Sequence, residues 1–167
     1  MEEETGLLLK PYAHRSDNWY GLKVWTDESM KAAFEKIDAA RFQIHVHSIG
    51  DGAAKYTLNA LESVRKTNSE RDSRHTLAHC QFMAPEDMKR MADMGMTAVV
   101  APYWMQVDDY FWNLYYPYLG KERASIQYPY KSLSDSGILN SFRIEFLQTP
   151  LKCFFFIIFT KAIEINI

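Results

Sequence analysis

Two histidines of this sequence are spaced so that they could bind one metal ion together. His47 ends the run Phe42–His47, in which apolar and polar residues alternate, and His79 lies near the end of a second strand-like run, His75–Cys80. They are 32 positions apart, close to the length of one strand–helix unit. Neighbouring parallel strands lie about 4.8 Å apart, so both imidazoles could reach one ion. Neutral imidazole is a good ligand for zinc and similar divalent metals.

The other histidines of these runs have more than one interpretation. Side chains alternate across a strand, so His45 shares a face with His47, and the same alternation groups His75, Leu77 and His79. We interpret His45, one layer deeper, as a packing or supporting residue first and a ligand second, and His75 as structural. A strand-end histidine is more often a hydrogen-bonded core residue than a ligand. Two histidines at equivalent ends of consecutive strands support a metal site and a structural role equally.

The runs around these histidines predict an α/β fold. An apolar stripe predicts a helix that begins at Thr26 or Asp27, and Asp51 is placed to cap a second helix after the Gly50–Gly52 turn. Pro85 begins a third helix that ends at Gly95, and 97–101 forms a buried strand. Strands that alternate with helices predict a parallel sheet.

Composition excludes several classes of protein. A chain of 167 residues is long enough for one domain and too short for a complete (β/α)8 barrel. A net charge of −2 argues against nucleic acid as a partner. Cys80 and Cys153 form no metal-binding or disulfide motif, and we interpret Cys80 as an inert core thiol. No secretory signal is recognisable, and the apolar run 153–159 is too short to span a membrane. We therefore predict a cytoplasmic protein with no membrane partner.

The segment from Tyr103 to Tyr130 is rich in aromatic residues, including Trp104. We expect a long loop with short helical turns that covers one end of the sheet. A packed lid or subunit contact and a substrate-binding wall are equally compatible with it.

Two motifs resemble a known family. His45–Ala53, His-Val-His-Ser-Ile-Gly-Asp-Gly-Ala, resembles the "HxHAIGDxA" signature at strand 5 of the amidohydrolase-3 subgroup of the amidohydrolase superfamily. Arg74–Gln81 is similar to its "RHxIEHxQ" at strand 6. The resemblance runs from about Glu4 to Gly137, and the two motifs together are fairly specific.

The resemblance implies a partial TIM (β/α)8 barrel, with about strands 5–7 and their helices. It implies a metal-dependent hydrolase acting on carbon–nitrogen bonds other than peptide bonds, in small substrates such as amides or formamides. His47 and His79 would bind a divalent metal, expected to be zinc. His45, Asp51, Gln81 and Trp104 would support these ligands or line the pocket.

The sequence also departs from the family pattern. The strand-1 HxH pair and the acidic or lysine ligand have no counterpart, and no aspartate matches the strand-8 general base after Gly137. Asp135 belongs to the preceding helix and is not a substitute. We therefore expect a partial barrel domain over 1–137, an apolar tail over 138–167, no catalytic residue in this chain and little or no activity on its own.

Two other functions stay open. The chain could be a non-catalytic binding or regulatory module that forms a homo-oligomer or associates with a full-length relative. It could also be a complete small α/β protein of different function, in which His47 and His79 lie far apart.

Overall fold

The computed structural model describes residues 2–142 and 162–166. The strands are β1 (Gln43–Ser48), β2 (Thr76–His79), β3 (Thr97–Val100), β4 (Leu139–Phe142) and β5 (Ala162–Asn166). The α-helices are α1 (Asp27–Ala39), α2 (Asp51–Asn68), α3 (Pro85–Asp93), α4 (Tyr116–Leu119), α5 (Lys121–Ser125) and α6 (Tyr130–Asp135). Short helical turns of other types are η1 (Glu2–Glu4), η2 (Pro102–Met105) and η3 (Phe111–Tyr115).

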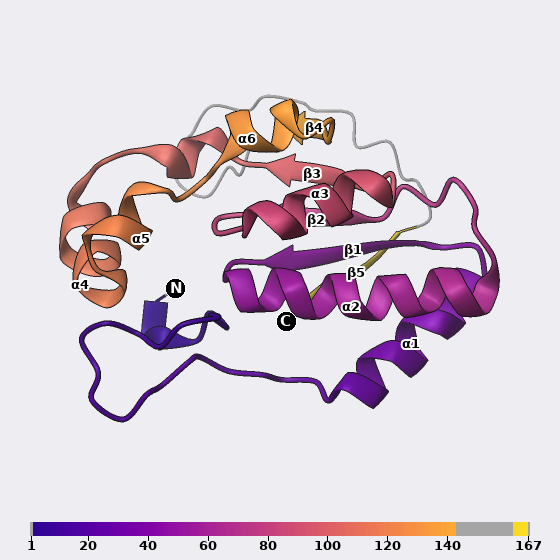
Figure 1. The fold of residues 1–167 in the computed structure, drawn as a ribbon, viewed down its shortest axis with the longest axis horizontal. Helices are drawn as coiled ribbons and strands as arrows, with labels where there is room; N and C mark the ends of the chain where they lie inside the picture. Colours follow the sequence, from indigo (N-terminus) through magenta and orange to yellow (C-terminus); the bar gives the residue numbers. More distant parts are fainter. Residues whose placement is uncertain (1, 143–161, 167) are drawn as a thin grey trace, which may run out of the picture.

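The strands form one five-stranded sheet in the order β4-β3-β2-β1-β5, and every neighbouring pair is parallel. Helices α2 and α3 connect β1, β2 and β3 and lie against one face of this sheet (Figure 1). The predicted α/β class and parallel arrangement are therefore confirmed.

Local sequence signals explain where the helices begin. Thr26 caps α1 through a reciprocal pair of hydrogen bonds with Ser29, which satisfies backbone groups at the helix start. Asp51 is the first residue of α2, and Pro85 is the first residue of α3, where its missing N–H costs no helical hydrogen bond. These starts fix the direction in which each strand leads into its helix.

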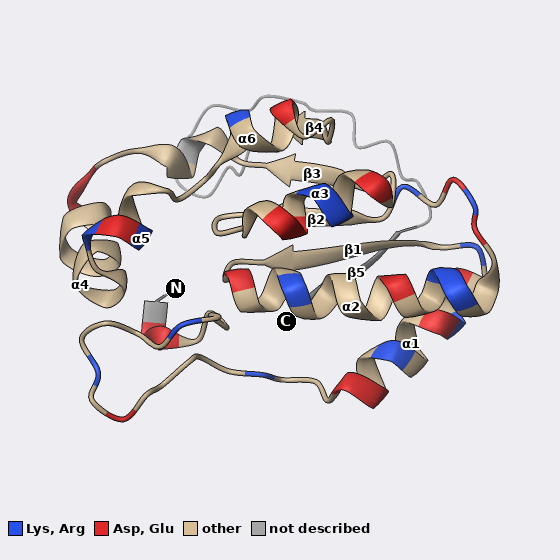
Figure 2. Cartoon of the chain, viewed as in Figure 1, with Lys and Arg blue, Asp and Glu red and all other residues tan. Residues whose placement is uncertain are grey.

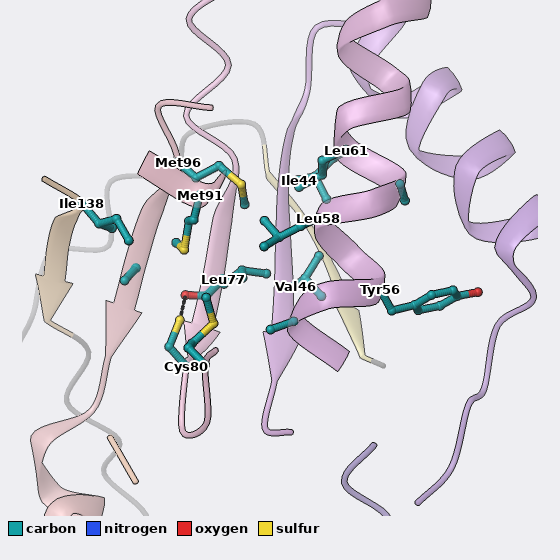
Figure 3. Close-up of a cluster of buried hydrophobic side chains, with 14 of the residues drawn as sticks. Ile44, Val46, Tyr56, Leu58, Leu61, Leu77, Cys80, Met91, Met96 and Ile138 are labelled. Atoms are coloured by element: carbon teal, nitrogen blue, oxygen red, sulfur yellow. Dashed lines mark hydrogen bonds between the residues drawn. The ribbon is translucent and has the colours of Figure 1, made fainter. Parts of the chain in front are cut away.

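Apolar side chains fill the space between the sheet and its helices. Ile44 and Val46 of β1 and Leu77 of β2 are fully buried there, against Leu58 and Leu61 of α2 (Figure 3). Full burial of such a side chain stabilises the fold by about 1.5–3 kcal/mol. Alternation then assigns His45 and His47 to the opposite face of β1.

Charged side chains are distributed unevenly between the strands and the helices. Strands β1, β2 and β3 contain no Lys, Arg, Asp or Glu, whereas α1, α2 and α3 carry both signs on their surfaces (Figure 2). The polar groups of these three strands are hydroxyls, one amide and imidazoles, which are neutral or weakly basic.

A second apolar cluster covers the carboxyl ends of the strands. The N-terminal segment and helices α4 and α5 gather at this end, on the left of Figure 1. The cluster consists of Leu8, Tyr12, Phe82, Phe111, Leu119 and Ala124, and we call it the rim cluster. The prediction of short helical turns covering one end of the sheet is confirmed.

Gly50 lets the N-terminal segment approach closely. A Cβ atom at this position would lie 1.8 Å from the backbone oxygen of Leu7, so no larger residue fits without a backbone shift. The same Leu7 oxygen accepts a hydrogen bond from the N–H of Ala53, 3.2 Å away. The first turn of α2 is thereby joined to the N-terminal segment.

Strands β4 and β5 come from the segment that the sequence predicted to be an apolar tail, and both join the sheet. The predicted apolar run 153–159, with Cys153, lies outside the described residues. The domain boundary after residue 137 stays a prediction. In the parts of the chain that the structure describes, no helix is both long and apolar enough to cross a membrane.

Candidate metal centre

The rings of His47 and His79 meet at the carboxyl ends of β1 and β2. His47 Nδ1 lies 3.2 Å from His79 Nε2, within hydrogen-bonding distance, and the ring centroids are 5.0 Å apart. Both residues are partly buried. The arrangement in which these two histidines lie far apart, left open by the sequence, is therefore wrong.

The position of the His79 ring depends on a backbone conformation that strand alternation does not predict. Alternation grouped His75, Leu77 and His79 on one face of β2. Leu77 lies in the core beneath the helices and His75 contacts Asp38 of α1, whereas His79 lies beside His47, so the place of His79 in this group is wrong. His79 has φ +68° and Cys80 has φ +46°, both in the left-handed region. This backbone turn ends the alternation and carries the His79 ring to the face of His47.

His45 lies next to His47 on the same face of β1. The two ring centroids are 5.7 Å apart, with the planes at 67°. Thr76 Oγ1 of β2 lies 2.6 Å from His45 Nδ1. Thr76 carries no motif that marks it in the sequence, and its place opposite His45 follows from the register of β1 and β2.

His75 is held at the opposite, amino end of β2. Its Nδ1 accepts the backbone N–H of Ile44 at 3.0 Å, and its Nε2 lies 3.3 Å from Asp38 Oδ1. Burial lowers the pKa of the His75 imidazole to about 4, although the Asp38 carboxylate acts in the opposite direction. The neutral ring bridges α1, β1 and β2.

The remaining predicted site residues lie around the same end of the sheet. Asp51 Oδ1 accepts the backbone N–H groups of Leu9 and Gly52, each at 2.9 Å, and so joins α2 to the N-terminal segment. Gln81 is 1% exposed, and its side chain donates to Gln127 Oε1 at 3.1 Å. Trp104 is partly buried in η2, directly after β3.

The donor set is suited to a divalent metal but small. Two nitrogen ligands at about 2.0–2.1 Å from a tetrahedral zinc ion lie about 3.3 Å from each other. The 3.2 Å between His47 Nδ1 and His79 Nε2 fits this spacing. Cys80 is fully buried, and burial raises the pKa of its thiol to about 12, so it offers no thiolate. Among residues 2–142 and 162–166, no group of three or more His, Cys, Asp or Glu side chains could hold an ion.

Proteins with similar sequences include a putative bacterial amidohydrolase and a plant protein. The chain is 30% identical over 135 residues to "Putative amidohydrolase YtcJ" of Bacillus subtilis (strain 168), covering 81% of this chain and 24% of that protein. It is 31% identical over 102 residues to "Protein LONG AFTER FAR-RED 3" of Arabidopsis thaliana, covering 61% of this chain and 17% of that protein. The chain therefore spans a quarter or less of the length of these curated relatives.

Solved structures show the same fold. Uncharacterized metal-dependent hydrolases from Pyrococcus furiosus and Pyrococcus horikoshii OT3 match with TM-scores of 0.67 and 0.68, at 20% and 22% identity. Each match covers 84% of this chain and 27% or 26% of the other. The predicted partial TIM-barrel architecture is thus confirmed. The sequence model described as "Amidohydrolase family" matches residues 1–142, and the chain belongs to this family.

Proposed function

We propose that His47 and His79 bind one divalent metal ion, and that this ion is zinc. The observation that carries the proposal is the 3.2 Å between His47 Nδ1 and His79 Nε2 at the ends of neighbouring parallel strands. This spacing already suits two ligands of one ion, so the strands can stay in place when the ion binds. The two rings must turn, because the two nitrogens point toward each other. The carboxyl ends of parallel barrel strands are also where catalytic groups gather.

The activity that we propose for this family member is hydrolysis of carbon–nitrogen bonds other than peptide bonds, in small amides or formamides. When bound, a divalent metal lowers the pKa of a bound water and polarises the carbonyl under attack. His47 and His79 would hold it, and His45 would support His47 from the side. Gln81 and Trp104 would border the substrate. Asp51 would position α2 beside the centre through the N-terminal segment.

We further propose that this chain alone hydrolyses such substrates slowly or not at all. Two imidazoles leave at least two positions of a tetrahedral ion to water or to other ligands. The resemblance implies an aspartate at the end of strand 8 as general base. Strand β4 takes the place of that strand beside β3 and has the sequence Leu-Asn-Ser-Phe, without an acid.

Zinc titration of the purified chain tests the metal site. Calorimetry should show one zinc ion bound per chain, and His47→Ala should remove this binding. His14→Ala is the matched control, because His14 lies in the N-terminal segment and contacts Glu4 at 2.7 Å. Equal zinc binding by His47→Ala and the unmodified chain would contradict the site.

An assay with simple amides and N-formyl compounds, in the presence of zinc, tests the activity. We expect no turnover above background for the chain alone. Fast turnover that disappears in His47→Ala would overturn the proposed lack of efficient hydrolysis while supporting the metal site and the reaction.

One observation favours a second function, association with a longer relative. Strand β4 lies at the edge of the sheet, with β3 as its neighbour within the described strands, and Leu139 on it is 70% exposed. An exposed strand edge can pair with a strand from another chain. Size-exclusion chromatography of the chain with a full-length relative tests this function, and two separate peaks would reject it.

A further inference from the structure

We propose that Thr76 is a positioning residue for the metal centre, and that it acts through His45. This inference rests on the proposed binding of metal by His47 and His79. Three contacts form a continuous row across β1 and β2. Thr76 Oγ1 lies 2.6 Å from His45 Nδ1, the His45 ring lies edge-on to His47 at 5.7 Å, and His47 Nδ1 lies 3.2 Å from His79 Nε2.

Thr76 is suited to hold a neighbouring ring. It pairs directly with His45 in the β1–β2 register and is 6% exposed. The branched Cβ of threonine restricts its χ1 rotamers, so the hydroxyl has a defined place. A hydroxyl can donate to or accept from either tautomer of imidazole. The hydrogen bond therefore fixes the orientation of the His45 ring.

The orientation of His45 matters because the ligand rings must turn. The nitrogens His47 Nδ1 and His79 Nε2 point toward each other at hydrogen-bonding distance. To share an ion, each ring must rotate until its nitrogen lone pair points to a common position. The His45 ring packs against one side of His47, so it limits the directions in which His47 can rotate. By holding His45, Thr76 thus limits the rotation of the His47 ring.

Three variants test this role in the full chain. Thr76→Val removes the hydroxyl and keeps the branched shape, whereas Thr76→Ser keeps the hydroxyl. Thr97→Val is the matched control, because Thr97 pairs with Thr76 in the β2–β3 register and is 9% exposed. Loss of a group that orients a metal-binding histidine weakens affinity about 10-fold or more. By calorimetry, Thr76→Val should lose about this much zinc affinity, and the other two variants should retain it.

A second measurement reads the contact itself. In metal-free chain labelled with 15N at histidine, the His45 Nδ1 resonance should shift in Thr76→Val and stay in place in Thr76→Ser and Thr97→Val. If Thr76→Val does not fold, Thr76→Ala replaces it in both measurements. This readout does not depend on metal, so it tests the contact between Thr76 and His45 separately from the proposed metal site, and a chain that binds no zinc while the resonance still shifts would reject the metal site and leave the contact in place.

Two results would overturn the inference. An unchanged His45 resonance in Thr76→Val would show that the hydroxyl does not hold the ring. Equal losses of zinc affinity in Thr76→Val and Thr97→Val would show a general effect on the sheet and no specific role of Thr76.

Discussion

The strands β1 and β2 place histidines in two contrasting environments at their opposite ends. At the amino end, His75 accepts a backbone N–H from Ile44 and lies 3.3 Å from Asp38, and burial lowers the pKa of its ring to about 4. At the carboxyl end, His47 and His79 are partly buried and face each other at 3.2 Å. The same residue type on the same pair of strands is structural at one end and suited to bind a ligand at the other.

The difference comes from what the neighbouring elements offer. Helix α1 places the Asp38 carboxylate beside His75. Arg71 Nε donates a hydrogen bond to the same carboxylate, at 2.9 Å from Asp38 Oδ1. At the other end, the imidazoles of His47 and His79 lie beside each other, and imidazole is a side chain that commonly binds metal ions. A histidine is therefore best interpreted from its partners.

Replacing Asp38 with alanine should destabilise the amino end most strongly. Asp38 is 4% exposed, and the variant leaves Arg71 and His75 without this carboxylate. Breaking a buried ion pair by removing one partner costs about 3–5 kcal/mol. Urea unfolding should show a loss of this size, with zinc affinity per folded chain unchanged. A loss of unfolding free energy below about 1 kcal/mol would mean that the contacts of Asp38 with Arg71 and His75 contribute little to stability.

Lowering the pH should also destabilise the chain through His75. The pKa of His75 is about 4 in the folded chain and 6.5 in its unperturbed state, so the unfolded chain binds a proton first as the pH falls. The contribution of His75 to the free energy of unfolding is complete above pH 6.5. It declines by roughly 3 kcal/mol as the pH falls to 4. Urea unfolding across this range measures it.

The control for the pH experiment is His75→Asn, which can still accept the N–H of Ile44. Carboxylates titrate in both proteins, so the effect of His75 is the difference between the two pH profiles. Parallel profiles between pH 6.5 and pH 4 would contradict a lowered pKa for the buried ring.

Replacing a histidine with asparagine at each end in turn should separate metal binding from the stability of the fold. His79→Asn should weaken zinc binding about 100-fold, since a direct ligand matters at least as much as the groups that orient it. His75→Asn should leave zinc affinity of the folded chain near that of the unmodified chain. Calorimetry at pH 7 measures both variants, and a similar loss in both would remove the distinction between the two ends.

The smallest predicted effect concerns the backbone at His79. Its φ of +68° is costly for any residue with a Cβ and is readily adopted by glycine. His79→Gly should therefore be more stable than His79→Ala by about 1 kcal/mol. Urea unfolding of the two variants gives the comparison, and equal stabilities would show that the left-handed turn is not maintained in solution.

Much of the fold could be predicted because local signals agreed with it. The alternation around His45 predicted β1, the capping residue Thr26 predicted the start of α1, and Pro85 predicted the start of α3. Each signal acts within a few residues, where steric and hydrogen-bonding preferences are strong. The meeting of His47 and His79 followed from their places at equivalent ends of parallel strands.

The features that could not be predicted depend on longer-range structure. The ring of His79 reaches His47 through two consecutive left-handed residues, which strand alternation does not foresee. The contact between Thr76 and His45 depends on the register of the two strands. The strands β4 and β5 depend on sheet pairing with β3 and β1, because nothing in their own sequences distinguished them from a tail.

The pairing of β5 with β1 has a consequence for how the chain folds as it is made. The partner of Gln43 in this ladder is Ala162, about 120 residues later. At about 5–20 residues per second, the ribosome needs on the order of ten seconds to supply it. During that interval the outer edge of β1 lacks its neighbour, so this edge is expected to be open to pairing with other chains until residues 162–166 have been made.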